Sequence, residues 1–301
     1  IREKDESGEA YTPTYMKSLV YIDFSEEDKY EENYDHLLRT IVGQPLYTKP
    51  SLGKIPSYLS NPSNSFLPTA GKFRRLNNAI MEGKPTVRMF ADDYVDSFVS
   101  SLPSYKIDYR NIQGIEIVSK VETSIQEMLV LRDDFIKFLS ILIKTDIGKG
   151  DYFIALFERI LQKLTDSGVS LLESNSLDGL ANDNFRYFLY DIFLSFTALM
   201  IKHEKFDVLR DLVTCKFCIE ENTYTQQVSY QTILRFRKYN YTLNRYKGEN
   251  SNRASAVADM MVKNSTVISS NELIKADLLL YYLSLIHGIK EDYTEYWYPE
   301  L

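Results

Sequence analysis

The residues best suited to contact another molecule lie in one basic, tyrosine-rich stretch. Between Val228 and Ala258 the sequence has six Lys or Arg residues and one acid, Glu249, although the whole chain has a net charge of −7. The cations can contact phosphates, and the tyrosines between them can stack on bases. A helix over 226–247 would place Arg235, Lys238 and Arg245 near one face. The candidate binding residues are Arg235, Arg237, Lys238, Tyr239, Tyr241, Arg245 and Tyr246.

The same stretch also has a structural interpretation. In an acidic protein, a basic face can pair with acidic residues of the same chain or of a partner subunit. The 23 tyrosines of the chain are typical of surfaces that meet ligands or other proteins. The sequence leaves both interpretations open: an anion-binding site, or a face that packs against acidic residues.

The remaining motifs carry little chemistry. Cys215 and Cys218 form one CKFC motif, but no second ligand pair follows it, and the three histidines are scattered at His36, His203 and His287. We therefore expect two ordinary thiols and no metal site. The sequence has no phosphate-binding loop, no dinucleotide-binding glycine motif, no GxSxG and no HExxH.

Three further features favour structural roles. The glycines of "DIGKGDYF" are too few for a phosphate cradle and predict a turn between helices. The neighbouring carboxylates Asp92 and Asp93, and Asp133 and Asp134, would diverge by about 100° on a helix, so neither pair converges on one ligand. We assign no catalytic residue in this sequence.

The composition is typical of a globular protein, with 44% hydrophobic and 26% charged residues. The longest apolar stretches are shorter than the roughly 18 residues that a membrane span needs, and one of them contains Asp191. The first ten residues have neither the apolar core nor the cleavage site of a signal peptide. We expect a cytoplasmic protein without membrane partners, and the sequence reads as part of a longer protein.

Hydrophobic periodicity predicts a mainly α fold, an irregular helical bundle over residues 70–301. Long amphipathic helices are predicted at about 117–142, 185–200 and 271–288, the last one ended by Gly288. The sequence has too few alternating runs to predict a sheet. Shorter helices are predicted at 72–82, 86–101, 151–165, 205–214, 226–247 and 252–263.

The first 69 residues have a different character. "SLVYIDF" (18–24) predicts a strand, and the apolar residues from Tyr30 to Ile41 recur with helical spacing. Ser25 can cap this helix, and Gly43 can end it. The five prolines of residues 44–69 predict an extended connector. We expect this N-terminal part to pack on the helical region.

A resemblance extends over this N-terminal part only. "VYIDF", "YEENYDHLLRTI" and "KPSLGKIPSYL" follow one another as in the C-terminal end of bacterial TIR or SEFIR-type domains, which residues 1–60 resemble. The resemblance implies that residues 1–43 are the remnant of a flavodoxin-like α/β domain whose earlier elements lie upstream of Ile1. Enzymatic TIR domains cleave NAD with a glutamate from an earlier helix, and no residue here matches that glutamate.

Two functional hypotheses follow. In the first, the chain is the C-terminal sensing or oligomerisation module of a bacterial TIR-type antiphage defence effector. The module is non-catalytic and needs no cofactor, and NAD is the substrate of the implied upstream domain. Its partner would be a second copy or another protein. In the alternative, the chain is a helical module that binds a nucleotide or nucleic acid through the basic stretch.

Overall fold

The structure is a computed structural model whose described residues are 22–24, 26–43, 67–112, 114, 116–145, 147–222, 227–246, 255–289 and 296–301. The chain divides into two units, Ile1–Ser60 and Asn61–Leu301. Most of the described residues are helical, and the strands among them form one two-stranded sheet. The predicted fold class, mainly α, is therefore confirmed. No described helix is both long enough and apolar enough to span a membrane.

The described part of the N-terminal unit is built around one helix, α1 (Tyr30–Ile41), which follows a 3-10 turn at Glu27–Lys29. The helix ends as predicted: Gly43 has a φ of 72° and donates its N–H to the carbonyl of Thr40 at 3.3 Å. The first residue of α1 is preceded by Lys29, which makes no side-chain cap. The predicted cap, Ser25, and most of the predicted strand lie outside the described residues, and residues 22–24 have no regular secondary structure.

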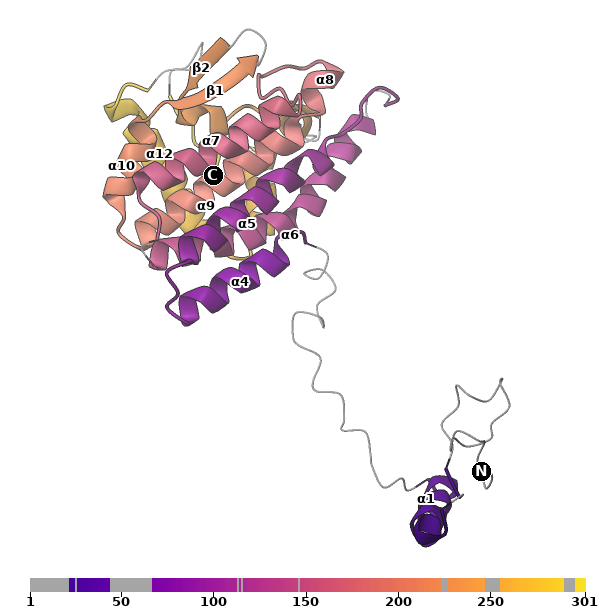
Figure 1. The fold of residues 1–301 in the computed structure, drawn as a ribbon. Coiled ribbons are helices and arrows are strands. Elements are labelled where there is room, and N and C mark those ends of the chain that lie inside the picture. The colour runs from indigo at the N-terminus through magenta and orange to yellow at the C-terminus, as the bar shows by residue number, and fades with distance from the viewer. Residues whose placement is uncertain are drawn as a thin grey trace. The chain divides into compact units, whose positions relative to one another are not determined.

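The second unit is a bundle of helices with a hairpin at one edge (Figure 1). Its helices are α4 (Ala70–Met81), α5 (Val87–Ser101), α6 (Glu116–Lys144), α7 (Gly150–Asp166), α8 (Leu177–Leu180), α9 (Asp183–Lys202), α10 (Phe206–Thr214), α11 (Ala256–Asn264) and α12 (Ser270–Ile286). All three long predicted helices and five of the six shorter ones are present within a few residues of the predicted bounds. Of the predicted connector, residues 44–66 lie outside the described residues, and Thr69 is buried in the bundle.

Helix α9 forms the centre of the bundle. Every side chain from Asp183 to Met200 is buried, because α6, α10 and α12 all pack on this helix. Apolar residues occur on every side of this helix, and a helix of that kind has to be surrounded. Phe193 of α9 stacks on Phe236 with centroids 4.5 Å apart, and beside α9 Phe98 of α5 stacks on Phe135 of α6 at 4.1 Å.

The predicted helix at 226–247 is wrong. The strand β1 (Phe217–Asn222) pairs antiparallel with β2 (Gln227–Gln231), and a 3-10 turn η4 (Ile233–Phe236) and a π-helical turn η5 (Thr242–Tyr246) follow. Burial alternates along β1, where Phe217 and Ile219 are buried and the side chains next to them are not. That period of two is typical of a strand on a core. Arg235, Lys238 and Arg245 therefore do not share a helix face.

Candidate functional site

Arg237, from the predicted basic site, lies between the bundle and the last residues of the chain. Its Nη2 is 2.8 Å from Oε1 of Glu300, and its Nε donates to the carbonyl oxygen of Tyr298 at 2.6 Å. The guanidinium carbon is 5.9 Å from the centroid of the Tyr190 ring. Only 14% of the Arg237 side chain is exposed. This arginine ties the stretch after β2 to the C-terminal segment, Trp297–Leu301.

The other predicted site residues do not form one continuous surface. Lys238 is buried, Arg235 is half-buried in η4 and Arg245 is exposed in η5, and all three have partners within the protein. The rings of Tyr239 and Tyr241 meet edge to face with centroids 4.8 Å apart. The backbone of Tyr246 belongs to η5, and its side chain lies outside the described parts. Their role in binding stays a prediction.

The start of α9 holds the segment between η4 and η5 in place. The carboxylate of Asp183 accepts the N–H of Thr242 at 2.7 Å, and the side-chain amide of Asn240 donates to the Asp183 carbonyl at 2.9 Å. The same carboxylate pairs with Arg186, and both side chains are completely buried. Burial raises the pKa of Asp183 despite the neighbouring Arg186. A network of long-range contacts therefore fixes this non-helical segment.

A buried carboxylate on α12 anchors the C-terminal segment. Asp277 accepts hydrogen bonds from the hydroxyl of Tyr190 at 2.8 Å and from the indole N–H of Trp297 at 2.6 Å. It also accepts the backbone N–H groups of Glu300 at 2.8 Å and Leu301 at 3.1 Å. Asp277 and Trp297 are both fully buried. This anchor was not predicted from the sequence, where its signal is one acid next to the apolar run 278–286.

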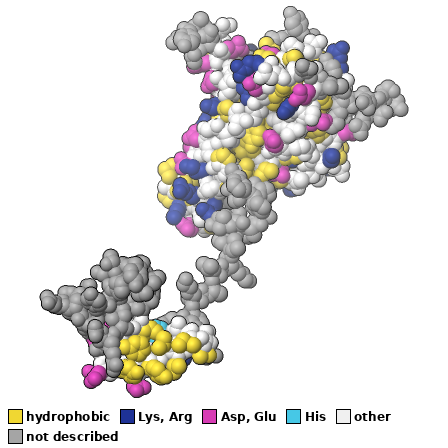
Figure 2. All heavy atoms as spheres, turned by 90° about the vertical axis from the view of Figure 1, so that its right-hand side faces the viewer, with side chains coloured by type: hydrophobic (Ala, Val, Ile, Leu, Met, Phe, Trp, Pro, Cys, Tyr) yellow, Lys and Arg dark blue, Asp and Glu magenta, His cyan; other side chains and the backbone are white. Residues whose placement is uncertain are grey.

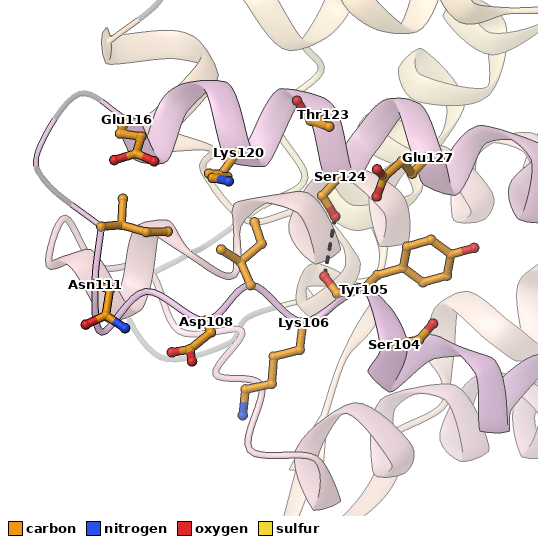
Figure 3. Close-up of a pocket in the computed structure, with 12 residues that line it drawn as sticks. Ser104, Tyr105, Lys106, Asp108, Asn111, Glu116, Lys120, Thr123, Ser124 and Glu127 are labelled. Atoms are coloured by element: carbon orange, nitrogen blue, oxygen red, sulfur yellow. Dashed lines mark hydrogen bonds between the residues drawn. The ribbon is translucent and has the colours of Figure 1, made fainter.

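A polar hollow of about 500 Å³ lies between α6 and the extended segment 106–112 (Figure 3). Its charged lining residues, of both signs, are Lys106, Asp108, Glu116, Lys120 and Glu127.

The one buried hydroxyl in this hollow has a structural role. The hydroxyl of Ser124 donates to the carbonyl of Tyr105 at 3.3 Å, and the amide of Asn184 donates to Ser124 at 2.9 Å. Lys106 reaches away to the carbonyl oxygen of Ser167 at 2.7 Å. A shallow hollow with scattered charges suits weak contact with a polar segment better than bond-breaking chemistry.

The two cysteines are free thiols in the structure. Cys215 is half-buried, its Sγ donates to the carbonyl of Leu212 at 3.1 Å, and burial raises its pKa to about 12. Cys218 is exposed on β1. Among the described residues, no group of three or more His, Cys, Asp and Glu side chains could hold a metal ion.

Helix α12 has an apolar face that points into solvent. Four side chains on this face are exposed: Leu278 by 42%, Tyr282 by 58%, Leu285 by 37% and Ile286 by 75%. The opposite face, which includes Leu273, Ala276 and Leu280, is buried against the bundle. A surface helix normally carries polar residues on its outer side. We name Ile274, Leu278, Tyr282, Leu285 and Ile286 the α12 outer face.

Helix α1 also presents an apolar face. Figure 2 shows hydrophobic side chains gathered on one side of the N-terminal unit. No residue of α1 is buried, and Tyr30, Tyr34, Leu38 and Ile41 are all exposed. The rings of Tyr30 and Tyr34 stack with centroids 6.2 Å apart. The helical spacing of the apolar residues from Tyr30 to Ile41 predicted an amphipathic helix. Within the described residues of the unit, the apolar side of this helix is exposed.

Comparisons of this chain with family models, with curated proteins and with solved structures found no match.

Proposed function

We propose that this chain is a helical interaction module of a bacterial TIR-type defence effector and that it is non-catalytic in itself. The observation that carries the proposal is the α12 outer face. When the second face of a helix is also apolar, a partner that covers this face gains free energy by removing apolar surface from water. An exposed apolar surface of this kind marks a contact with another protein.

The surroundings of the basic stretch also favour an interaction module over the alternative function. Phosphate binding needs cations that are exposed to the ligand. Arg237 instead neutralises Glu300, and Lys238 is buried. At Arg237 the stretch thus follows the structural interpretation, in which a basic residue meets an acidic residue of the same chain.

The exposed side of α1 supports the TIR-type part of the proposal. In an α/β domain, helices bury one apolar side against a sheet. The stripe formed by Tyr30, Tyr34 and Leu38 is what such a helix would present to that sheet. The NAD-cleaving activity would belong to the rest of the α/β domain, because the acid of the resembled family has no counterpart in this chain.

Incubation of the purified 301-residue chain with NAD tests the proposal. We expect no turnover, and a variant with Glu31→Gln in the acidic first turn of α1 should behave like the wild type. NAD cleavage by the wild type that is lost in this variant would overturn the proposal.

A fluorescence-polarisation titration with short single-stranded oligonucleotides at two salt concentrations tests the alternative. Phosphate contacts would weaken affinity by about 0.7 to 0.9 log units per log unit of salt for each phosphate neutralised. Binding with that salt dependence, abolished by Arg245→Glu, would favour the nucleic-acid module. Absence of binding would favour the interaction module.

A further inference from the structure

The α12 outer face extends along most of the helix. Ile274, Leu278, Tyr282 and Ile286 follow one another at intervals of four residues, and Leu285 lies between two of them around the helix. At 100° per residue the five positions cover about 120° of the helix surface. Ile274 is partly exposed and the other four are exposed. From Leu278 to Ile286 this arc carries apolar side chains only, whereas Asn271 and Lys275 share it near the start of the helix.

Ile274, Leu278, Tyr282 and Ile286 lie symmetrically about the midpoint between Leu278 and Tyr282, whereas the counterpart of Leu285 is Lys275. A two-fold axis between Leu278 and Tyr282 would bring Leu278 beside Tyr282 of a second copy and Ile274 beside Ile286 of that copy. We propose that the α12 outer face binds the α12 outer face of a second copy of this chain in an antiparallel helix pair. This inference rests on the proposed interaction function and names the partner.

The charges on the face permit this pairing. Lys275 is the one charged residue among the exposed positions between Asn271 and Ile286. In the antiparallel arrangement, Lys275 lies beside Leu285 of the second copy, so the two lysines of the pair stay apart. Asp277, which is the nearest acid along α12, points inward to the buried Trp297. Two copies can therefore meet without burying like charges against each other.

The area of the face matches the apolar part of a stable dimer interface. A large side chain has about 150 to 250 Å² of surface, so the exposed fractions on the outer face amount to roughly 400 Å² per copy. A standard interface buries about 800 Å² per partner, of which somewhat more than half is apolar. The outer face thus supplies most of the apolar area that such an interface needs.

Sedimentation analysis of the full chain across micromolar concentrations tests the proposal. We expect the wild type to form dimers, and Leu278→Lys or Tyr282→Glu alone to raise the dissociation constant by about tenfold or more, since each puts two buried charges into the interface. Both residues are exposed in the single chain, so circular dichroism should show an unchanged fold.

Mixing the Leu278→Lys and Tyr282→Glu variants tests the antiparallel arrangement. In a mixed dimer, the introduced lysine of one copy would lie beside the introduced glutamate of the other, while the second Leu278–Tyr282 contact keeps its wild-type residues. We therefore expect the equimolar mixture to associate more strongly than either variant alone. A mixture that stays as monomeric as its components would overturn the antiparallel pairing.

Two matched controls introduce a lysine at exposed apolar positions elsewhere. Met89→Lys on α5 and Leu38→Lys on α1 should leave the dimer unchanged. A wild type that is monomeric throughout, or a dimer that is lost in Leu38→Lys and kept in Leu278→Lys, would overturn the proposal. If either result is obtained and the chain also shows no NAD turnover, only the pairing through α12 is overturned. The proposed interaction function would then remain, with a different partner or surface.

Discussion

The indole N–H of Trp297 lies 2.6 Å from the carboxylate of Asp277 and joins the C-terminal segment to α12 at a fully buried point. The backbone N–H of Trp297 also donates at 3.0 Å to the hydroxyl of Ser284, which lies further along the same helix. The segment therefore runs beside α12 and covers its inner side. The same helix that presents the outer face is held in position by this anchor.

Asp277→Ala should destabilise the helical unit strongly. The substitution leaves the hydroxyl of Tyr190, the indole of Trp297 and two backbone N–H groups buried without their acceptor. We expect a loss of about 3 to 5 kcal/mol in the free energy of unfolding, because each unsatisfied donor costs about 1 to 3 kcal/mol before relaxation. Urea denaturation measures this loss in the free energy of unfolding. Asp96→Ala, which breaks a surface pair with Arg159, is the control and should cost less than about 1 kcal/mol.

Trp297→Phe refines this test, because it keeps most of the ring area and removes the donor. We expect a smaller loss, about 1 to 3 kcal/mol. Equal stability of Asp277→Ala and the Asp96→Ala control would show that the anchor contributes nothing.

Arg237 and Arg245 should respond differently to truncation. Arg237→Ala breaks the largely buried pair with Glu300 and also the bond to the Tyr298 carbonyl, so we expect a loss of about 2 to 4 kcal/mol in unfolding free energy. Arg245→Ala changes an exposed side chain and should cost less than about 1 kcal/mol. Thermal or urea unfolding distinguishes the two variants. A larger effect at Arg245 would contradict the structural role assigned to Arg237.

The sequence predicted the helices well where their periodicity extended over several turns. The apolar residues from Ile117 to Leu142 recur with helical spacing over many turns, so they predict α6 closely. Gly288 follows α12, as predicted, with a φ of 59°. Prediction failed at 226–247, where short apolar runs fit a strand and a helix equally well. The contacts that decide between them, such as Asp183 to Thr242, join residues far apart in the sequence.

The surfaces were harder to predict than the helices. The run "LLLYYLSLI" lies in a helix that was predicted as amphipathic, and only the packed structure shows that Leu278, Tyr282 and Ile286 face solvent. The basic stretch differs in charge from the rest of the chain, which made it the candidate site. At Arg237 the positive charge is balanced by Glu300, which lies far along the sequence. A local sequence pattern contains no information about that pair.

Ser269→Ala should weaken the start of α12. Ser269 accepts the N–H of Glu272 at 3.4 Å, and the Glu272 carboxylate accepts the N–H of Ser269 at 2.9 Å, which is a capping box. We expect a loss of about 1 kcal/mol and a lower melting temperature. Ser104→Ala, in an exposed 3-10 turn, is the control. A melting temperature equal to that of the control would mean that the cap is not needed.

The cap should also depend on pH. The Ser269 hydrogen bonds, assisted by Lys202, lower the pKa of Glu272 to about 2. Because the folded-state pKa is lower than that of the unfolded chain, the stabilisation is present above about pH 4.5 and is lost as the pH falls toward 2. The difference in stability between the wild type and Glu272→Gln should therefore shrink on acidification.

Asp191 should give the opposite pH dependence. This carboxylate is fully buried on α9, 2.8 Å from Nη1 of Arg132, and burial raises its pKa to about 6 although Arg132 opposes the shift. The folded-state pKa is higher than the ordinary value of 3.8, so the folded protein binds more protons than the unfolded chain between about pH 4 and 6. The contribution of Asp191 to stability therefore falls as the pH rises through that window.

Asp191→Asn tests this sign, because an asparagine cannot titrate. The variant should be less stable than the wild type at both ends of the window, since it weakens a buried pair. We expect the loss in unfolding free energy, relative to the wild type, to be smaller at pH 7 than at about pH 4.5. The difference between the two pH values should be on the order of 2 kcal/mol, since one pKa unit corresponds to about 1.36 kcal/mol.

Asn264→Ala is the control, because it removes a non-titrating partner of Tyr187 and should show an equal deficit at both pH values. Urea unfolding at the two pH values measures both deficits. A deficit of Asp191→Asn that is constant or grows toward pH 7 would mean that Arg132 keeps the carboxylate ionised throughout.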